Sequence, residues 1–534
     1  MDPTAPINRR TLLRRGLQVG GVVAGAALVA VALEDSRHHT VTSSTTTSTT
    51  STSTTLGPAT PSDWTALAAS LTGALILPSD GTYAADALLY NEKFVDLHPQ
   101  AIAYCANAED VARCVDFATA HETGLAARSG GHSYGGYSSC PGLVIDVSRL
   151  SSIVVDERTN TATVGSGAKL IDVYNAVGSH GLLLASGSCP TVGIAGITLG
   201  GGIGVLGRRY GLTSDNLRSL RLVTSDAHVV TASAEDHADL LWASRGGGGG
   251  NFGVATSFTF ALHPVPELTL FTLQYPWPAA AALLEAWQHW TLTAPDELWS
   301  NCQLLTQGTY GYLAQTSGVF CGTPSALAGL LAGLERAVGS APTYRFVGAK
   351  AYIDAMAIEA GCAGLTIAAC HLAGESPGGT LSRSAYSAKS SYVDQPMDSA
   401  HVTAIVDAVQ HLHTSAPTVG GGLAFDAYGG VINRVAPDAT AFVHRDKLAG
   451  IQATYSWSSA TPASEIDAGA QWLTWLGATV FDPRTGAYQN YIDPTLANWA
   501  TAYYGTNLER LALVKKTYDP ENHFAFAQSI APAP

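Results

Sequence analysis

Two glycine-rich loops constrain this chain more than any other feature. The first covers residues 129–137 (Ser-Gly-Gly-His-Ser-Tyr-Gly-Gly-Tyr), and the second extends from residue 187 to 204. Glycine has no Cβ, so consecutive glycines let backbone N–H groups converge on an anion such as a pyrophosphate. Each loop also carries a nucleophilic side chain, His132 in the first and Cys189 in the second. Either loop alone could be a plain connection, but the pair predicts a cofactor site.

The sequence around these loops predicts a mixed α/β domain. Short apolar runs at 101–104, 125–128 and 143–147 are typical of strands. Residues 107–121 place Val111, Val115 and Ala118 on one helical face, which predicts a helix that ends before Gly124. Strands and helices therefore alternate as far as the second loop.

The second loop also contains a G-x-G-x-x-G match, Gly202, Gly204 and Gly207. In a Rossmann site this pattern opens an amphipathic helix that follows a strand. Here the next residues include Gly211, Ser214 and Asn216, which interrupt a helical pattern. We therefore treat the match as coincidental.

Charge and size exclude other classes of protein. The 534 residues carry 28 Lys and Arg against 42 Asp and Glu, a formal net charge of −14. That balance is the opposite of what neutralising nucleic-acid phosphates requires, so no nucleic-acid partner is expected. The length exceeds that of one small module, and 46% hydrophobic residues supply a sizeable core.

The N-terminal residues are typical of a targeting signal rather than of a folded domain. Arg9 and Arg10 precede an apolar stretch at 16–33, which predicts an export signal over residues 1–38 and resembles a twin-arginine signal. The alternative is a membrane anchor, although Gln18 and four glycines make the stretch a poor permanent span. Residues 39–61 are rich in Ser and Thr and predict a disordered linker. We expect a secreted protein with no stable membrane span.

Eight cysteines are present and none forms a C-x-x-C pair. Zinc ribbons and thioredoxin-type sites are therefore not expected, and we predict no metal. Cys362 and Cys370 could close a small loop in an oxidising compartment, so a disulfide between them is expected.

Three ordered motifs resemble those of a known family. They are Arg-Ser-Gly-Gly-His-Ser-Tyr at 128–134, Gly-Ser-Cys-Pro-Thr-Val-Gly at 187–193, and a C-terminal set that begins with Tyr-Gln-Asn-Tyr-Ile-Asp at 488–493. The chain resembles the berberine bridge enzyme-like flavin oxidases of the vanillyl-alcohol oxidase/para-cresol methylhydroxylase (PCMH) fold, over roughly residues 80–531. Within that family it is similar to the glucooligosaccharide oxidase and aclacinomycin oxidoreductase branches.

The resemblance implies an α+β architecture with a two-part FAD-binding domain. Its parts would be residues 62–267 and 455–534, the latter carrying the berberine-bridge-like motif. They would enclose a substrate domain at 268–454, an antiparallel sheet covered by helices.

The resemblance also implies FAD attached twice, by His132 to the flavin 8α-methyl and by Cys189 to C6. Val192 matches the position where a small residue lets oxygen reach the flavin. Cofactor-binding roles are implied for the motif residues as a set: Ser129, Gly130, Gly131, Ser133, Val192, Gly193, Gly196, Gly201, Gly202 and Asn490.

Catalytic roles follow by the same resemblance. Tyr491 matches the family's base. A phenol with a pKa near 10 needs help to act as a base, so a neighbouring carboxylate is expected, and Asp426 is the candidate. Asp426 could instead be a strand-end turn residue. Tyr134 matches a sugar-stacking position or packs against the flavin, and Tyr428 is expected in the substrate pocket.

The expected function is a secreted, monomeric FAD-dependent oxidase. It would transfer hydride from an alcohol, in the first place a saccharide hydroxyl, to FAD and reduce O₂ to H₂O₂. Two alternatives remain open: a tailoring oxidase of a glycosylated secondary metabolite, and a non-catalytic exported binding protein on the same fold.

Overall fold

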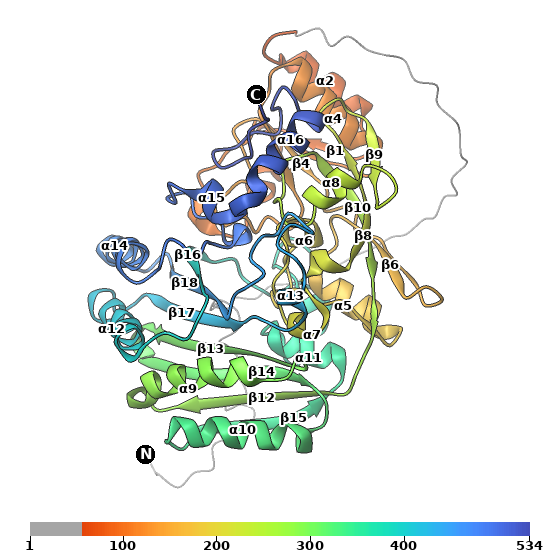
Figure 1. Cartoon of the computed structure of the whole chain (residues 1–534). Coiled ribbons are helices and arrows are strands. Elements are labelled where there is room, and N and C mark those ends of the chain that lie inside the picture. The colour runs from red at the N-terminus through yellow and green to blue at the C-terminus, as the bar shows by residue number, and fades with distance from the viewer. Residues whose placement is uncertain (1–55) are drawn as a thin grey trace.

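The computed structural model describes residues 56–534 (Figure 1). The predicted export signal, residues 1–38, and most of the predicted linker, 39–61, lie outside the described residues. The first described helix, α2 (Pro61–Ser70), packs Trp64 and Leu67 into the core. Between residues 56 and 534, no helix has the length and apolar character needed to cross a bilayer.

The N-terminal part begins with a four-stranded sheet in the order β1-β2-β4-β3. Strands β2, β4 and β3 are parallel, and α4 (Ala108–Ala120) connects β2 to β3. Asn107 caps α4, since its side chain accepts a hydrogen bond from the N–H of Asp110. The predicted strands and helix are confirmed. The strands are β1 (Ala74–Ile76), β2 (Ala101–Tyr104), β3 (Leu125–Arg128) and β4 (Leu143–Asp146).

A five-stranded antiparallel sheet follows, in the order β5-β6-β10-β8-β9. Helix α5 (Leu170–Ser179) packs Val173, Tyr174 and Val177 into its core. The strands are β5 (Ile153–Asp156), β6 (Thr161–Gly165), β8 (Leu217–Val223), β9 (Val229–Ala232) and β10 (Val254–Ala261). Short helices of this part are α3 (Tyr83–Asp86), α6 (Ile194–Leu199), α7 (Gly207–Tyr210) and α8 (Ala238–Ala243). Because α7 is one turn long, the G-x-G-x-x-G match opens no Rossmann helix.

A seven-stranded antiparallel sheet forms the other half of the molecule, in the order β15-β12-β14-β13-β17-β18-β16. Helices α9, α10, α12 and α14 cover its outer face (Figure 1). The strands are β12 (Leu268–Tyr275), β13 (Leu298–Gln307), β14 (Tyr312–Cys321), β15 (Tyr344–Lys350), β16 (Ala385–Val393), β17 (Gly420–Ala427) and β18 (Ala449–Trp457). The helices are α9 (Ala280–Thr293), α10 (Pro324–Val338), α11 (Tyr352–Glu359), α12 (Ser399–Ser415), α13 (Val431–Arg434) and α14 (Ala463–Thr479).

Alternation along these strands gives the sheet two different faces. On β13, Leu298, Cys302 and Leu304 enter the apolar core beneath the helices, whereas Asn301 and Gln303 face a cavity on the other side. The cavity-facing side therefore carries polar groups on a rigid support.

The predicted boundary between residues 454 and 455 falls inside β18. Trp472, Leu473 and Leu476 of α14 also pack into the core of the seven-stranded sheet. The sheet half therefore extends to about residue 480, because the last strand and its covering helix cannot be separated from it. The chain then returns to the N-terminal half through α15 (Trp499–Tyr504) and α16 (Leu508–Tyr518) (Figure 1).

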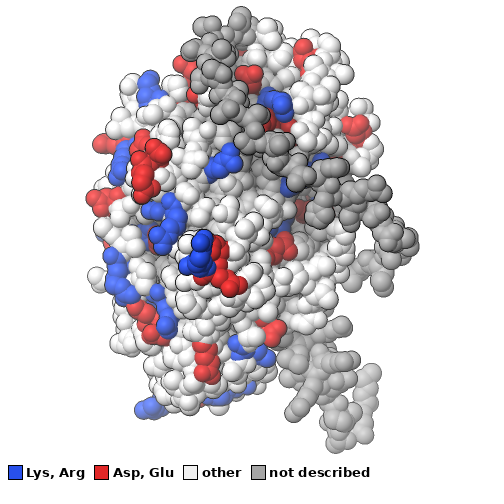
Figure 2. All heavy atoms as spheres, turned by 90° about the vertical axis from the view of Figure 1, so that its right-hand side faces the viewer, with Lys and Arg blue, Asp and Glu red and all other residues white. Residues whose placement is uncertain are grey.

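All eight cysteines lie in the described chain and all are free thiols, so the predicted disulfide between Cys362 and Cys370 is absent. Both thiols are buried in the same small core cluster. On the face shown in Figure 2, acidic and basic side chains are interspersed among uncharged ones, without a basic stripe.

Candidate functional site

A cavity of about 490 Å³ lies between the two halves of the molecule. One side, which we name the loop wall, consists of residues 129–134 and 187–197. The opposite side, which we name the sheet wall, consists of the cavity-facing residues of the seven-stranded sheet together with Glu359. The C-terminal motif at 488–492 closes the space between them.

The first loop presents unused hydrogen-bond donors to the cavity. The main-chain N–H groups of residues 130–134 donate no hydrogen bond to any described residue. The two loops also touch: a Cβ on Gly130 would lie 2.3 Å from the backbone nitrogen of Gly193. Glycine is therefore required at this approach, and the free N–H groups form a cradle for an anionic group.

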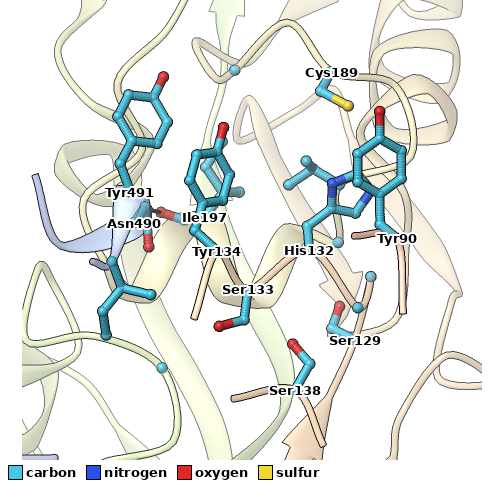
Figure 3. Close-up of a pocket in the computed structure, with 18 of the residues that line it drawn as sticks. Tyr90, Ser129, His132, Ser133, Tyr134, Ser138, Cys189, Ile197, Asn490 and Tyr491 are labelled. Atoms are coloured by element: carbon cyan, nitrogen blue, oxygen red, sulfur yellow. Dashed lines mark hydrogen bonds between the residues drawn. The ribbon is translucent and has the colours of Figure 1, made fainter. Parts of the chain in front are cut away.

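His132 is held in a defined orientation on the loop wall (Figure 3). Its ring stacks on Tyr90 with centroids 3.9 Å apart, and its Nε2 lies 2.9 Å from the hydroxyl of Thr191. Burial, assisted by the charges of Lys169 and Arg383, lowers the pKa of His132 well below its usual value. The imidazole is therefore neutral, and Nδ1 has no hydrogen-bond partner among the described residues.

Cys189 lies on the second loop, on the same side of the cavity as His132 (Figure 3). Its sulfur is 3.9 Å from the hydroxyl of Thr191, so one threonine contacts both nucleophilic side chains. Burial raises the pKa of the Cys189 thiol, although hydrogen bonds from residues 191 and 192 and the charge of Lys169 oppose the shift. The group is therefore a thiol at neutral pH.

The C-terminal motif is tied directly to the second loop. The hydroxyl of Tyr488 accepts hydrogen bonds from the N–H groups of Gly202 and Ile203, at 3.0 and 3.1 Å. Asn490 donates to the carbonyl of Ile197, and a Cβ on Gly200 would lie 2.0 Å from its side-chain oxygen. Residues almost 300 positions apart in the sequence thus form one surface.

This arrangement places Tyr491 in the cavity. Tyr491 ends a 3₁₀ turn, Gln489–Tyr491, and its ring stacks on Tyr134 with centroids 5.1 Å apart (Figure 3). Tyr134 in turn accepts a hydrogen bond from Gln452 of the sheet wall. Burial, with a smaller effect of Tyr134 and of Asp426, raises the pKa of Tyr491 well above its usual value. At neutral pH it is a phenol.

Asp426 enters the cavity from the sheet wall. In the sheet register it is paired with Asn301 on one side and Gly450 on the other. Burial raises the pKa of Asp426 to about 6. Its charge acts on Tyr491 without a hydrogen bond between them, so it raises the phenol's pKa. The carboxyl group therefore does not acidify the phenol.

The rest of the sheet wall is rich in amides and hydroxyls. Gln303 and Gln315 are paired in the register, and Gln315 accepts a hydrogen bond from Gln274. Asn301 accepts two hydrogen bonds from Ser317. Such groups can bind the hydroxyls of a polar ligand.

Glu359 ends helix α11 and lines the same cavity. Burial, with a smaller contribution from Asp426, raises the pKa of Glu359 to about 7. Two carboxyl groups with raised pKa values therefore share one site, which is a common mark of a functional cleft.

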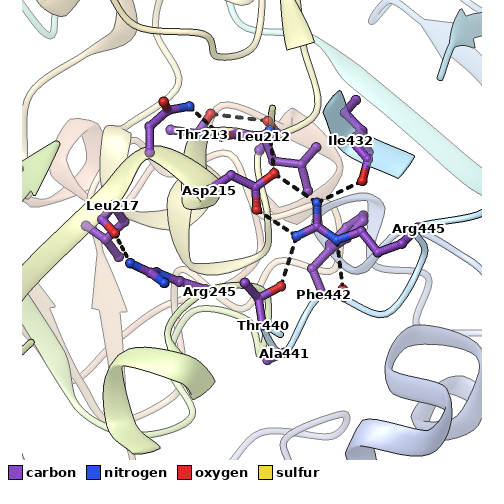
Figure 4. A network of polar contacts seen from close by, with 12 residues as sticks. Leu212, Thr213, Asp215, Leu217, Arg245, Ile432, Thr440, Ala441, Phe442 and Arg445 are labelled. Atoms are coloured by element: carbon purple, nitrogen blue, oxygen red, sulfur yellow. Dashed lines mark hydrogen bonds and ion pairs between the residues drawn. The ribbon is translucent and has the colours of Figure 1, made fainter. Parts of the chain in front are cut away.

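A buried ion pair supports the second loop from behind (Figure 4). Arg445 donates to both carboxylate oxygens of Asp215, at 2.8 and 2.7 Å. The turn that contains Asp215, Thr213–Asn216, donates its first two N–H groups to the carbonyls of Gly202 and Gly201. This pair thereby holds the turn on which the loop rests.

Most of the predicted site residues line one cavity. They are His132, Cys189, Ser129, Gly130, Gly131, Ser133, Tyr134, Val192, Gly193, Gly196, Asn490, Tyr491 and Asp426.

Three predicted residues do not line it. Gly201 and Gly202 lie behind the loop, where a Cβ would meet Phe442 at 2.6 Å and Thr213 at 2.3 Å, so their role is in packing. Tyr428 was expected in the substrate pocket, but it is fully buried beyond the end of β17 against Leu212 and Tyr392.

Sequence reasoning missed several residues of the site. Tyr90 and Thr191 hold His132, while Gln303, Gln315, Gln452 and Glu359 face the cavity. The alternation of Asn301 and Gln303 with Cys302 and Leu304 is visible in the sequence. This alternation indicates that one face of the strand is polar, but it does not indicate that this face lines a cavity.

The residues present fit FAD. The free N–H cradle suits a pyrophosphate, and His132 and Cys189 stand on the cavity as a neutral imidazole and a thiol. Tyr491 and Asp426 lie beyond them, where a substrate would meet the cofactor's reactive ring.

Comparison with known proteins gives the same picture. The FAD binding domain family model matches residues 99–233, and the "berberine and berberine like" model matches residues 487–531. The FAD-linked oxidoreductase YgaK of Bacillus subtilis is 33% identical over 467 residues, covering 86% of this chain and 97% of the relative. The glucooligosaccharide oxidase of Sarocladium strictum is 29% identical over 457 residues, covering 82% and 88%.

Solved structures extend the likeness to the whole architecture. The berberine bridge enzyme-like protein 1 of Physcomitrella patens matches with a TM-score of 0.79 and 29% identity, covering 88% of this chain and 99% of that one. The predicted α+β fold of the vanillyl-alcohol oxidase/PCMH type is confirmed.

Proposed function

The chain belongs to the berberine bridge enzyme-like family of FAD-linked oxidoreductases, and we propose that it oxidises a saccharide hydroxyl group and passes the electrons to dioxygen. The name of the glucooligosaccharide oxidase relative supports the substrate class. The amides and hydroxyls of the sheet wall support it independently, because hydrogen-bonding side chains suit a polyhydroxylated ligand. The products are a lactone or ketone and H₂O₂.

One observation carries the proposal: His132, Cys189 and Tyr491 line a single cavity. We propose that His132 and Cys189 both attach the cofactor covalently. When bound, FAD supplies an acceptor for the substrate hydride and a route for two electrons to O₂. Val192 also lines the cavity on the loop wall, and we propose that its small side chain lets oxygen reach the flavin.

The proposed proton path uses Tyr491 and Asp426. As hydride leaves the substrate carbon, the substrate hydroxyl gives its proton to the phenol oxygen of Tyr491. Because Tyr491 is itself protonated at neutral pH, its own proton must move on. Asp426, ionised above about pH 6, lines the same cavity and is the proposed acceptor.

The test combines colour, reduction and peroxide release. The purified protein should be yellow, and anaerobic mixing with gluco- or chito-oligosaccharides should bleach the flavin. Air should then restore the colour with one H₂O₂ released per turnover. Bleaching only by aromatic glycosides would favour a tailoring oxidase, and no bleaching by any alcohol would contradict an oxidase function.

We also propose that the protein is exported through the twin-arginine route with its cofactor bound, on the strength of Arg9 and Arg10 before the apolar stretch. Replacing both by lysine should retain the precursor in the cytoplasm. Normal secretion of that double variant would point to another route.

A further inference from the structure

Glu359 is an acidic residue of the cavity that the proposed proton path does not use. It stands at the last residue of α11 and lines the cavity, yet it makes no hydrogen bond or ion pair with any described residue. Helix α11 is anchored by Tyr352, Ala355 and Met356, which are buried in the large core of the N-terminal half. The carboxyl group is therefore held at the cavity by a rigid element.

Three physical effects oppose a negative charge at this place. Partial burial removes some of the water from the carboxylate, and Asp426 repels it. The C-terminal end of a helix, where backbone carbonyls are unpaired, also disfavours an acid. With a pKa of about 7, Glu359 is only partly ionised at neutral pH, and a cationic group on a ligand would supply the partner that its carboxylate lacks.

The surroundings show which kind of partner is missing. Among the described cavity-lining residues, the sheet wall contributes amides, hydroxyls and the two carboxyl groups, but no Lys or Arg. Within residues 56–534, Arg128 is the one arginine that lines the cavity; it lies on the opposite side and is paired with Asp146 at 2.5 Å. The substrate end of the cavity therefore carries only acidic charge.

We propose that Glu359 binds a protonated amino group on the substrate. The preferred saccharide is then an amino sugar rather than an uncharged sugar or a uronic acid. This inference rests on the proposed oxidation of a saccharide at this cavity. The ammonium group supplies both the positive charge and the hydrogen-bond donors that the carboxylate lacks. Asp426 adds to the attraction while it remains available to Tyr491.

The experiment uses three sugar glycosides, one with a positive charge, one with no charge and one with a negative charge. The methyl glycosides of glucosamine, N-acetylglucosamine and glucuronic acid are titrated calorimetrically into the flavin-loaded protein under anaerobic conditions at pH 7. A charge-assisted hydrogen bond predicts that the glucosamine glycoside binds on the order of tenfold or more tightly than its N-acetyl counterpart. The glucuronide should bind weakest.

Two variants identify the residue responsible. Glu359→Gln keeps the shape of the side chain and should remove the preference for glucosamine. Asp354→Asn removes an exposed carboxylate from the first turn of the same helix and should leave the preference intact. Flavin content and the circular dichroism spectrum of each variant show that it is folded.

The outcomes separate this inference from the proposed function. Equal affinities for the amino and N-acetyl glycosides, or a preference that persists in Glu359→Gln, would overturn the role of Glu359 while leaving saccharide oxidation in place. If no sugar of any charge binds or bleaches the flavin, both proposals fail together.

Discussion

The two walls of the cavity are built in different ways. The loop wall consists of two short glycine-rich segments whose functional groups are backbone N–H groups and the adjacent His132 and Cys189. The sheet wall takes one to three residues from each of several strands, and two from helix α11, between residues 272 and 456. Its character depends on strand register, since a shift by one residue would turn every polar side chain into the apolar core.

This difference suggests a division of labour. The loop wall has the donors and nucleophiles to hold a cofactor, while the sheet wall has the amides and carboxyls to select a substrate. Tyr491 lies between them, stacked on Tyr134 of the loop wall and in electrostatic contact with Asp426 of the sheet wall. Changes on each wall should therefore affect different measurements, and the following predictions test whether they do.

The largest effect is expected on the loop wall. Replacing both His132 and Cys189 by alanine should release all flavin into the supernatant on acid precipitation. Cys189→Ala alone should retain flavin through His132, seen as one FAD added to the mass of the intact denatured chain. Asp426→Asn, on the sheet wall, should keep covalent flavin at the unmutated level. Complete release of flavin from the unmutated protein would refute double attachment.

The next effect concerns Tyr491, which joins the walls. Tyr491→Phe should slow anaerobic flavin reduction by about 10²–10⁴-fold, the range for loss of a general base. The flavin content should not change, because the stacking ring remains. Stopped-flow absorbance isolates this half-reaction from reoxidation by O₂. Reduction at the unmutated rate would mean that Tyr491 only packs against the substrate.

A smaller effect, with a characteristic pH dependence, is expected for Asp426. Only the ionised carboxylate can accept a proton, so the reduction rate of the unmutated protein should fall as pH drops through about 6. In Asp426→Asn the flavin should be reduced more slowly, and the rate should no longer fall as pH drops through about 6. In Glu359→Gln the fall in rate at acidic pH should remain. The double variant with Tyr491→Phe should be little worse than Tyr491→Phe alone, since residues of one relay are not additive. If the reduction rate of Asp426→Asn still falls as pH drops through about 6, a group other than Asp426 causes the pH dependence.

The same contrast explains what the sequence could predict. Residues 128–134 and 187–193 are short local motifs, so the sequence could predict most of the residues by which the loop wall lines the cavity, while their roles stay predictions. Gly201 and Gly202 belong to the same pattern but serve packing against Phe442 and Thr213, because a glycine pattern does not tell which side of the backbone faces the ligand.

The sheet wall was largely invisible to sequence reasoning. Glu359 lies in an ordinary helix, and only the docking of α11 beside the cavity gives it a role. Tyr428 shows the opposite error: it is two residues beyond Asp426, but β17 ends at Ala427, so strand alternation no longer fixes the direction of its side chain. Long-range register and the ends of strands decide such positions.

The smallest effect, and the one that most sharpens the division of labour, concerns Thr191. Its hydroxyl engages Nε2 of His132, so it orients the ring and leaves Nδ1 free to attach the cofactor. A single hydrogen bond of about 0.5–1.5 kcal/mol predicts that Thr191→Ala slows attachment about two- to tenfold. The measurement is the time course of acid-stable flavin after FAD is added to apoprotein in the Cys189→Ala background, where His132 is the only anchor.

Attachment replaces one C–H bond of the cofactor's 8α-methyl by a C–N bond, and dioxygen takes up the two electrons released. Thr191→Ser keeps the hydroxyl and should attach at the unmutated rate, whereas Thr191→Val keeps the shape and should be as slow as Thr191→Ala. Substrate preference should be the same in all three, because Thr191 does not reach the sheet wall. A slow Thr191→Ser variant would show that the methyl group, and not the hydroxyl, positions His132.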